Sequence, residues 1–293
     1  MKLSGEAKII LGSAMFAFIP VCVKLAPGVG IESLLFGRIF FASLIFLIGF
    51  KNRILLFKIP KKDLFLLVVW SCIMSAAMLT YFYAIRFCGA AISSALLGIQ
   101  PVVVIILAFI ILKEVITRIS IVAGLLSLSG IYFISDLSCN SNSPNILIGE
   151  LLAVISAILL ALNFIYQKKY LTHFSSKKLV FYQSVFQLPV FLPFLIKNNN
   201  DVNSSFLVAS LILGVFCTVI AYTLIYNGAS EVEAQKIGIL QSIEFVLPVF
   251  IGYYFFNEEI DIYKLIGISL IIISCLLIHY KPSNNVCFRK MIS

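Results

Sequence analysis

Hydrophobic residues occur in ten long runs that are separated by short polar connections. The runs cover approximately residues 9–26, 33–50, 64–86, 90–112, 119–136, 148–167, 179–196, 206–228, 234–256 and 262–280. Most are close to the ~20 residues that a helix needs to cross a hydrocarbon core of about 30 Å. A helix satisfies its backbone hydrogen bonds within one segment, which a lipid-embedded segment requires. The pattern therefore predicts an all-α membrane protein with ten transmembrane helices.

Polar and glycine positions recur at a constant distance of 144 residues, without gaps from residue 5 to about residue 280. The matching pairs include Gly5 and Gly149, Glu6 and Glu150, Lys24 and Lys168, Ala77 and Ala221, Gln100 and Glu244, and Glu114 and Glu258. The repeat predicts two similar units, 1–137 and 145–281, followed by a tail, 282–293. Each unit holds five spans, and an odd number makes the second unit enter the membrane from the opposite side. Such inverted repeats are typical of secondary transporters.

Composition and charge agree with a membrane location. Hydrophobic residues make up 61% of the 293 residues and charged residues 12%, against about 45–50% and roughly 25% in soluble domains. The net charge of +9 does not indicate nucleic-acid binding, because the Lys and Arg residues lie between apolar runs. If the N-terminus is cytoplasmic, 17 of the 22 Lys and Arg fall on that side and 3 on the other. The positive-inside rule thus predicts cytoplasmic termini in a multi-pass protein of the cell (inner) membrane.

The sequence shows no pattern for a metal, a cofactor or a nucleotide. Its seven cysteines form no CxxC pair, and its two histidines form no HExxH motif. A GxxxxGK[ST] loop is also absent, which argues against direct ATP drive by this chain. We therefore expect no cofactor, no metal and no catalytic residue. The expected partners are a small-molecule substrate and the lipid bilayer, with the protein acting as a monomer or homodimer.

Several motifs resemble one known family. The first half carries Arg38 early in its second run, then Ala90–Ala91, Gln100–Pro101, Lys113–Glu114 and Gly130; the second half carries Gly228, Glu244, Pro248, Glu258 and Gly267. Over nearly its whole length the chain resembles the drug/metabolite transporter superfamily, specifically its ten-helix EamA-type members. The resemblance implies secondary transport of small metabolites, often amino acids or related compounds and frequently as export. Where many relatives carry a Trp in the first helix, this chain reads Phe16 to Pro20.

Three polar residues are predicted at the middle of the membrane. Glu244 lies about ten residues into its run, or about 15 Å along a helix. A carboxylate at that depth costs about 2.5–3.5 kcal/mol on insertion scales and should face a cavity or a partner. Glu244 is thus a candidate for binding a substrate amine or a coupling proton, or else a protonated residue bonded to a neighbouring helix. Gln100 and Gln241 either orient substrate or join helices by hydrogen bonds.

Two cations and several aromatic residues are further candidates. Arg38 could bind a substrate carboxylate; alternatively it snorkels to the surface or pairs with Glu32. Lys24 has the same two interpretations. The other candidates for substrate contact are Tyr81, Tyr222, Asn163 and Tyr166. For the tyrosines, including Tyr83 and Tyr226, the alternative is an interfacial aromatic belt, which also accounts for Trp70.

Four residues are candidates for kinks and gating. Pro101 and Pro248 lie next to the mid-depth polar residues, where a proline inside a helix would bend it and free a carbonyl. Glu114 and Glu258 lie at the ends of their runs and are either gate residues or solvated boundary carboxylates.

Three function classes remain open from the sequence. The leading one is a secondary transporter that works by alternating access on small polar or amphipathic metabolites. The second is a drug or hydrophobe efflux protein, or a lipid flippase, which should have a more apolar cavity. The third is a membrane-embedded lipid-modifying enzyme, for which the chain offers only the acidic cluster Glu258, Glu259 and Asp261.

Overall fold

The computed structural model describes residues 3–26, 28–49, 59–134, 144–197, 203–256 and 260–279. All regular structure in these ranges is helical, without a strand, which confirms the predicted all-α class for the described part of the chain. Helix starts follow ordinary capping chemistry. Ser4 accepts a hydrogen bond from the amide of Ala7, and Asn203 accepts one from the amide of Phe206.

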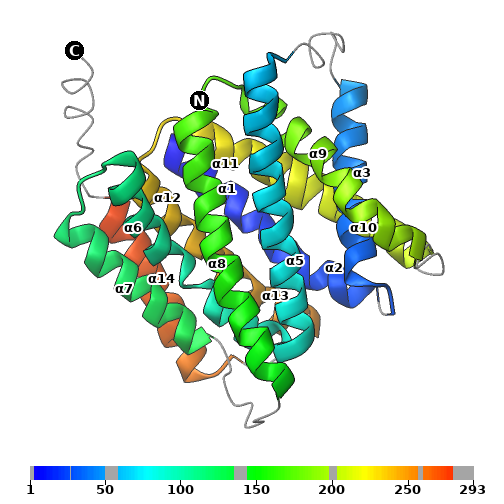
Figure 1. Ribbon diagram of the computed structural model, residues 1–293. Helices are drawn as coiled ribbons and strands as arrows, with labels where there is room; N and C mark the ends of the chain where they lie inside the picture. Colours follow the sequence, from blue (N-terminus) through cyan, green and yellow to red (C-terminus); the bar gives the residue numbers. More distant parts are fainter. Residues whose placement is uncertain are drawn as a thin grey trace.

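The helices form a bundle in which most elements run between two ends of the molecule (Figure 1). The first half contains α1 (Gly5–Ala14), the 3₁₀ turn η1 (Met15–Ala17), α2 (Phe18–Leu25), α3 (Ile31–Gly49), α5 (Lys61–Leu97), α6 (Gln100–Leu112) and α7 (Arg118–Ile134). The second half contains α8 (Pro144–Tyr170), α9 (Ser176–Lys197), α10 (Ser204–Gly214), the π-helical segment η3 (Val215–Ile220), α11 (Ala221–Ala229), α12 (Ala234–Gln241), the 3₁₀ turn η4 (Ser242–Phe245), α13 (Leu247–Phe256) and α14 (Ile262–His279).

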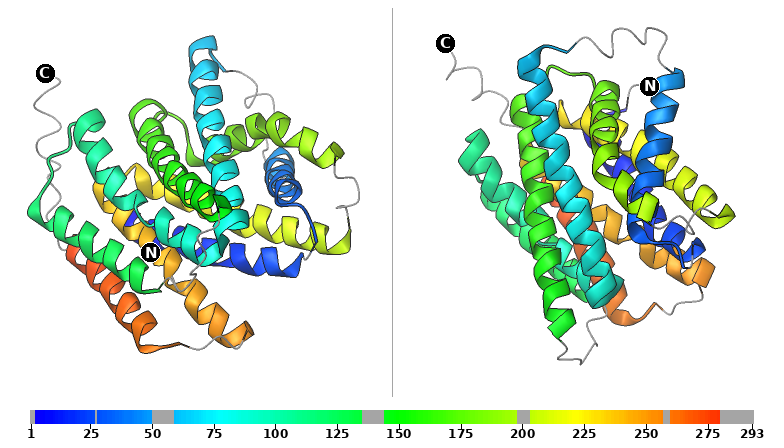
Figure 2. Two further views of the ribbon diagram at one scale, coloured as in Figure 1. Left: turned by 60° about the horizontal axis from the view of Figure 1, so that its bottom comes forward. Right: turned by 45° about the vertical axis from the view of Figure 1, so that its right-hand side comes forward.

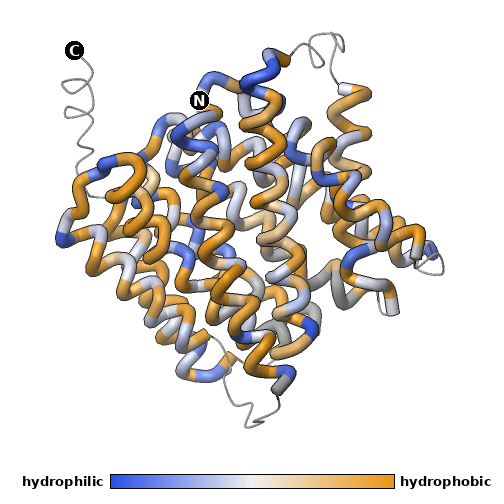
Figure 3. The backbone as a smooth tube through the Cα atoms, in the orientation of Figure 1, coloured by the Kyte–Doolittle hydropathy of each residue, from blue (hydrophilic) through white to orange (hydrophobic). Residues whose placement is uncertain are grey.

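Long apolar surfaces cover the outside of the bundle. Figure 3 shows hydrophobic residues along the flanks of α7, α8 and α14, and hydrophilic ones near the connections. Large apolar side chains are also exposed on other helices, including Phe65 of α5 at 68% and Ile110 of α6 at 63%. Such a surface suits lipid, since soluble monomers rarely expose large contiguous apolar patches. In the described ranges, seven helical segments are long and apolar enough to cross a membrane, and α6 and α7 are shorter apolar helices. The count of ten spans stays a prediction.

The structure differs from the sequence prediction at one helix boundary and at two prolines. The third and fourth runs, predicted as separate helices, are joined because α5 continues to Leu97. Ala90 and Ala91 favour helix, and the break falls instead at Gly98 and Ile99. The proposed kinks at Pro101 and Pro248 are also not found as predicted, because each proline is the second residue of its helix, α6 or α13. There a proline needs no amide partner.

Contacts between the halves are reciprocal under the 144-residue shift. Helix α3 packs on its counterpart α9, and α7 packs on α14, while α1 packs on α11 as α8 packs on α5 (Figure 2). Gly130 lies close to Gly267, and the 144-residue shift relates these two positions to Ser274 and Ala123. The Ser274 hydroxyl donates to the carbonyl of Ala123 at 2.6 Å, so the equivalent pair is also in contact. Such paired contacts between equivalent positions are the pattern of a two-fold arrangement.

Candidate functional site

Arg38 is the central residue of the candidate site. It lies in the first half of α3, and only 4% of its surface is exposed. Its Nε atom donates to the hydroxyl of Thr218 at 2.7 Å, and its Nη2 atom donates to the carbonyl of Cys217 at 2.9 Å. Both acceptors belong to η3, a π-helical turn of the kind frequently found at functional sites. The irregular helix in the second half therefore positions a cation from the first half.

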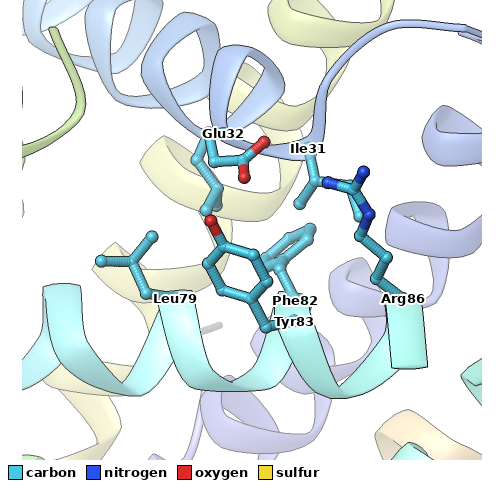
Figure 4. A pocket seen from close by; sticks show the side chains of 7 residues that line it. Ile31, Glu32, Leu79, Phe82, Tyr83 and Arg86 are labelled. Carbon is cyan, nitrogen blue, oxygen red and sulfur yellow. The ribbon is translucent and has the colours of Figure 1, made fainter. Parts of the chain in front are cut away.

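The alternatives for Arg38 can now be decided. Its burial excludes snorkelling, and no carboxylate of the described residues forms an ion pair with it. Its guanidinium carbon lies 5.8 Å from the centre of the Tyr222 ring, within cation–π range. Glu32 instead forms a hydrogen bond with Tyr83, in a filled pocket between α3 and α5 beside Arg86 (Figure 4).

A small cavity adjoins Arg38 between α3, α5, α9 and the η3–α11 segment. Its polar lining comes from Gln183, Ser184 and Gln187 of α9 and from Thr218. The rest of the lining is Leu35, Ile39, Met74, Met78, Phe191 and Tyr222. The volume is about 20 Å³, which is close to the minimum that one water needs. The site is therefore closed around a buried charge in this conformation.

An aromatic cluster connects this cavity to Glu244. The Tyr222 ring packs edge-on against Phe16, with ring centres 5.2 Å apart. It is tilted against the Tyr226 ring, whose centre lies 5.4 Å away. Glu244 lies in η4, is half-buried, and is close enough to Tyr222 for an electrostatic interaction. Arg38 and Glu244 thus approach Tyr222 from different halves of the chain.

The fourth and ninth predicted runs are broken at equivalent places. The first break follows Leu97 and the second follows Gln241, which are 144 residues apart. Gln100 then begins α6, and Glu244 lies in the turn η4 before α13. Interrupted helices leave backbone groups for a polar cavity and are found at the binding sites of many transporters. Gln241 has a buried Oε1 atom without a hydrogen-bond partner among the described residues.

Glu114, from the connection between α6 and α7, joins the halves at the start of α12. Its carboxylate accepts hydrogen bonds from the amides of Ala234 at 2.9 Å and Gln235 at 3.3 Å, and thereby caps α12. The Lys168 ammonium lies 3.6 Å away. Only 6% of Glu114 is exposed, so the interpretation as a solvated boundary carboxylate is wrong for this residue.

Further ion pairs surround Glu114. Lys8 pairs with Glu231, and Glu6 contacts both Lys236, at 3.2 Å, and His279. We call these seven residues the N-terminal-side network: Glu6, Lys8, Glu114, Lys168, Glu231, Lys236 and His279. The network fastens the α11–α12 connection to α1, α8 and α14 and closes this end of the bundle.

Two stretches of the chain, residues 3–136 and 147–280, each match the EamA-like transporter family. The chain belongs to this family. The second match begins and ends 144 residues after the first, which is the distance of the sequence repeat. Family membership confirms the resemblance inferred from the sequence and indicates a membrane transporter.

Relatives of this EamA-like protein agree with that conclusion. The Bacillus subtilis (strain 168) "Uncharacterized transporter YetK" is 28% identical over 225 residues, which cover 73% of this chain and 67% of the relative. An "Uncharacterized transporter" of Archaeoglobus fulgidus is 27% identical over 280 residues, covering 93% and 95% respectively. One protein crystal structure, at 12% identity, has a TM-score of 0.78 over 94% of this chain and 98% of its own. That likeness concerns the fold alone.

The remaining predicted site residues lie elsewhere in this EamA-like structure. Asn163 donates from its side chain to the carbonyl of Trp70 at 2.8 Å, while the Trp70 indole donates to the carbonyl of Asn163 at 3.1 Å. Trp70 is fully buried and Tyr226 is 5% exposed, so the interfacial belt is the wrong interpretation for both. Tyr81 packs against Phe82 in a separate cluster.

Four predicted residues do not line the cavity or cannot be placed. Tyr166 stacks with Tyr170, with ring centres 4.8 Å apart. Lys24 and Pro248 lie in described helices, but their side chains fall outside the described residues, and so does the whole of Glu258.

Sequence reasoning missed the polar residues that α9 and η3 contribute to the cavity. Gln183 and Gln187 are four residues apart in the apolar run of α9, a spacing that places them on one face. This spacing was the available signal, which a comparison of the two halves does not bring out. Thr218 gave no signal of its own, since a single Thr is common in membrane helices.

Proposed function

We propose that this EamA-like protein is a secondary transporter that moves small polar or amphipathic metabolites, with amino acids and related compounds as the leading substrates. The observation that carries the proposal is the buried Arg38, which lines a cavity and has no carboxylate partner among the described residues. A buried charge in a membrane helix is costly unless it is paired, and such residues commonly mark substrate pathways. A substrate carboxylate would supply the missing counter-charge, and the guanidinium geometry suits it.

Glu244 gives the proposal a second charged group. Its electrostatic interaction with Tyr222, a member of the aromatic cluster, supports this role. A zwitterionic substrate would find Arg38 for its carboxylate and Glu244 for its amine. When no amine is present, Glu244 is the candidate carrier of a coupling proton.

The proposed architecture is ten spans in two inverted five-helix repeats, 1–137 and 145–281, with both termini cytoplasmic in the cell (inner) membrane. The reciprocal contacts of α3 with α9 and of α7 with α14 support the repeat. The excess of Lys and Arg on the N-terminal side supports the orientation. In this orientation the N-terminal-side network is the cytoplasmic gate, and alternating access requires the network to separate.

The test is untargeted metabolite exchange in proteoliposomes. Wild-type protein should exchange carboxylate-bearing metabolites, Arg38→Met should abolish the exchange, and Arg38→Lys should retain part of it because the charge remains while the two-pronged geometry is lost. Arg118→Met is the matched control, since Arg118 is exposed and lies outside the cavity. Absence of any exchange by folded wild-type protein would contradict a transport function.

The alternative of hydrophobe efflux or lipid flipping is favoured by one observation. Five apolar side chains form one side of the cavity, and two of them are the adaptable methionines Met74 and Met78. Export of an apolar dye or a labelled lipid that survives Arg38→Met would favour this alternative over carboxylate transport.

A further inference from the structure

Two glutamines of α9 extend the Arg38 site. Gln183 and Gln187 are 4% and 5% exposed, and both line the cavity. The Nε2 atom of each is buried and has no hydrogen-bond partner among the described residues. A buried donor without a partner is destabilising, because the group has lost water and gained nothing in return. Two such donors therefore lie on one face of one helix, next to a cation that has no carboxylate partner among the described residues.

Three polar groups around the cavity already have hydrogen-bond partners. The Thr218 hydroxyl accepts from Arg38 and donates to the carbonyl of Leu213 at 3.1 Å. The Oε1 atom of Gln183 accepts from the hydroxyl of Tyr226 at 2.8 Å, and its Nε2 atom is left without a partner among the described residues. The hydroxyl of Ser184 donates to the carbonyl of Val180.

The Arg38 guanidinium keeps unused donors of its own. It carries five N–H groups, and the structure gives it hydrogen bonds to Thr218, Cys217 and Tyr222. The polar side of the cavity therefore offers free donors around a positive charge. The group that fits such a lining accepts hydrogen bonds and carries negative charge.

We propose that Arg38, Gln183 and Gln187 form a cradle for the carboxylate of the substrate, with its hydrocarbon part against Met74, Met78 and Phe191. The proposal rests on the proposed transport function and names the substrate end that this site recognises. Arg38 is the single charged residue in the lining. One cation matches a singly charged carboxylate better than a phosphate, which carries up to two charges and would call for more cations.

The cradle also joins the two halves of the protein. Arg38 comes from α3, and both glutamines come from α9, the counterpart on which α3 packs. A carboxylate held by all three side chains therefore bridges the repeats. Closure of the cavity around an acid would pair its buried donors, whereas closure around an amine would leave them unpaired.

The test measures ligand-induced thermal shift and dissociation constants for the full-length purified protein. The probes share a branched hydrocarbon part and differ at one end: L-leucine, 4-methyl-2-oxopentanoate and 3-methylbutylamine. Both acids should stabilise the wild type, and the amine should not. Gln187→Leu and Gln183→Leu should each weaken binding of both acids by about tenfold or more, because a hydrogen bond to a charged group is lost.

Stability separates a binding role from a structural one. The Nε2 atom of Gln187 has no hydrogen-bond partner among the described residues, so Gln187→Leu should leave the melting temperature of the empty protein unchanged or higher, whereas loss of a structural glutamine would lower it. Gln183→Leu also removes the acceptor of the Tyr226 hydroxyl and should lower the melting temperature. Gln187→Glu, which keeps the shape but presents a carboxylate to Arg38, should remove acid binding altogether. Gln167→Leu is the control, because Gln167 is equally buried and lies outside the cavity lining.

Three results would overturn the cradle: no stabilisation by either acid, equal stabilisation by the amine, or unchanged acid affinity in both Leu variants. Failure of the cradle is distinguishable from failure of transport. Metabolite exchange in proteoliposomes that is insensitive to Gln183→Leu and Gln187→Leu removes the cradle and leaves the transport function in place. Wild-type protein that binds the acids and exchanges no metabolite contradicts transport and leaves the cradle in place.

Discussion

Glu114→Ala is expected to open the end of the bundle that the N-terminal-side network closes. In the structure the Glu114 carboxylate accepts two amide hydrogen bonds from the start of α12 and pairs with Lys168 at 3.6 Å. The Glu114 side chain is 6% exposed and the Lys168 side chain 18%. The pair is therefore a buried one, for which the small energies of surface salt bridges do not apply.

The magnitude follows from these contacts. Removing one partner of a buried ion pair lowers the stability of the closed state by about 3–5 kcal/mol. Each hydrogen bond to a charged group contributes ~1.5–3 kcal/mol. The two values describe the same contacts of Glu114, so they are not added. If the contacts exist only in the closed state, a loss of about 3 kcal/mol raises the open population roughly a hundredfold. Glu114→Gln keeps one acceptor and loses the charge, so its effect should be roughly tenfold.

Labelling of the Cys217 thiol measures the opening. Cys217 is fully buried, and its carbonyl holds Arg38. In a variant that retains Cys217 as its sole cysteine, a membrane-impermeant maleimide is added from the side of the N-terminus. The labelling rate should rise about a hundredfold in Glu114→Ala and about tenfold in Glu114→Gln, in proportion to the open population.

Asp261→Asn is the matched control. Asp261 also caps a helix by accepting from an amide, that of Lys264 at 2.8 Å, but it is exposed and lies outside the network. A folded Glu114→Ala protein whose Cys217 is labelled no faster than in the wild type would refute the assignment of the network as a gate.

Three further predictions concern packing and substrate contact. Gly267→Ala should lower the melting temperature, by the equivalent of about 1–3 kcal/mol, because its new Cβ would lie 2.5 Å from the carbonyl oxygen of Gly130. Gly49→Ala is the control and should leave the melting temperature unchanged, because no atom lies within 4 Å of its new Cβ. Tyr222→Leu should weaken substrate binding by about threefold to thirtyfold through loss of the cation–π contact with Arg38, while Tyr222→Phe keeps the ring and most of the affinity in the same binding assay. Asn163→Leu should destabilise the protein by about 1–3 kcal/mol, because the carbonyl of Trp70 loses its donor, and in transport assays the KM of the folded fraction should stay unchanged.

Part of the candidate site was predictable because a charge in an apolar run is rare. Arg38 and Glu244 stood out for this reason, and the structure places both beside Tyr222. The partners of Arg38 were not predictable. They come from about 180 residues away and depend on a π-helical turn for which the sequence carried no mark. The repeat did not single out Gln183 and Gln187, whose counterparts 144 residues earlier are Ile39 and Ser43.

The sequence by itself determined the helical class, the apolar runs and the 144-residue repeat. It also determined the unequal distribution of Lys and Arg between the connections on the two ends of these runs. These properties are local, because transfer of each segment from water to lipid depends on its own side chains. Tertiary structure alone decided that the helix break falls after Leu97, that Glu114 caps α12, and that Arg38 shares a cavity with α9. Such meetings depend on how distant helices cross and pack, and close-packed interiors transmit every side-chain shape to its neighbours.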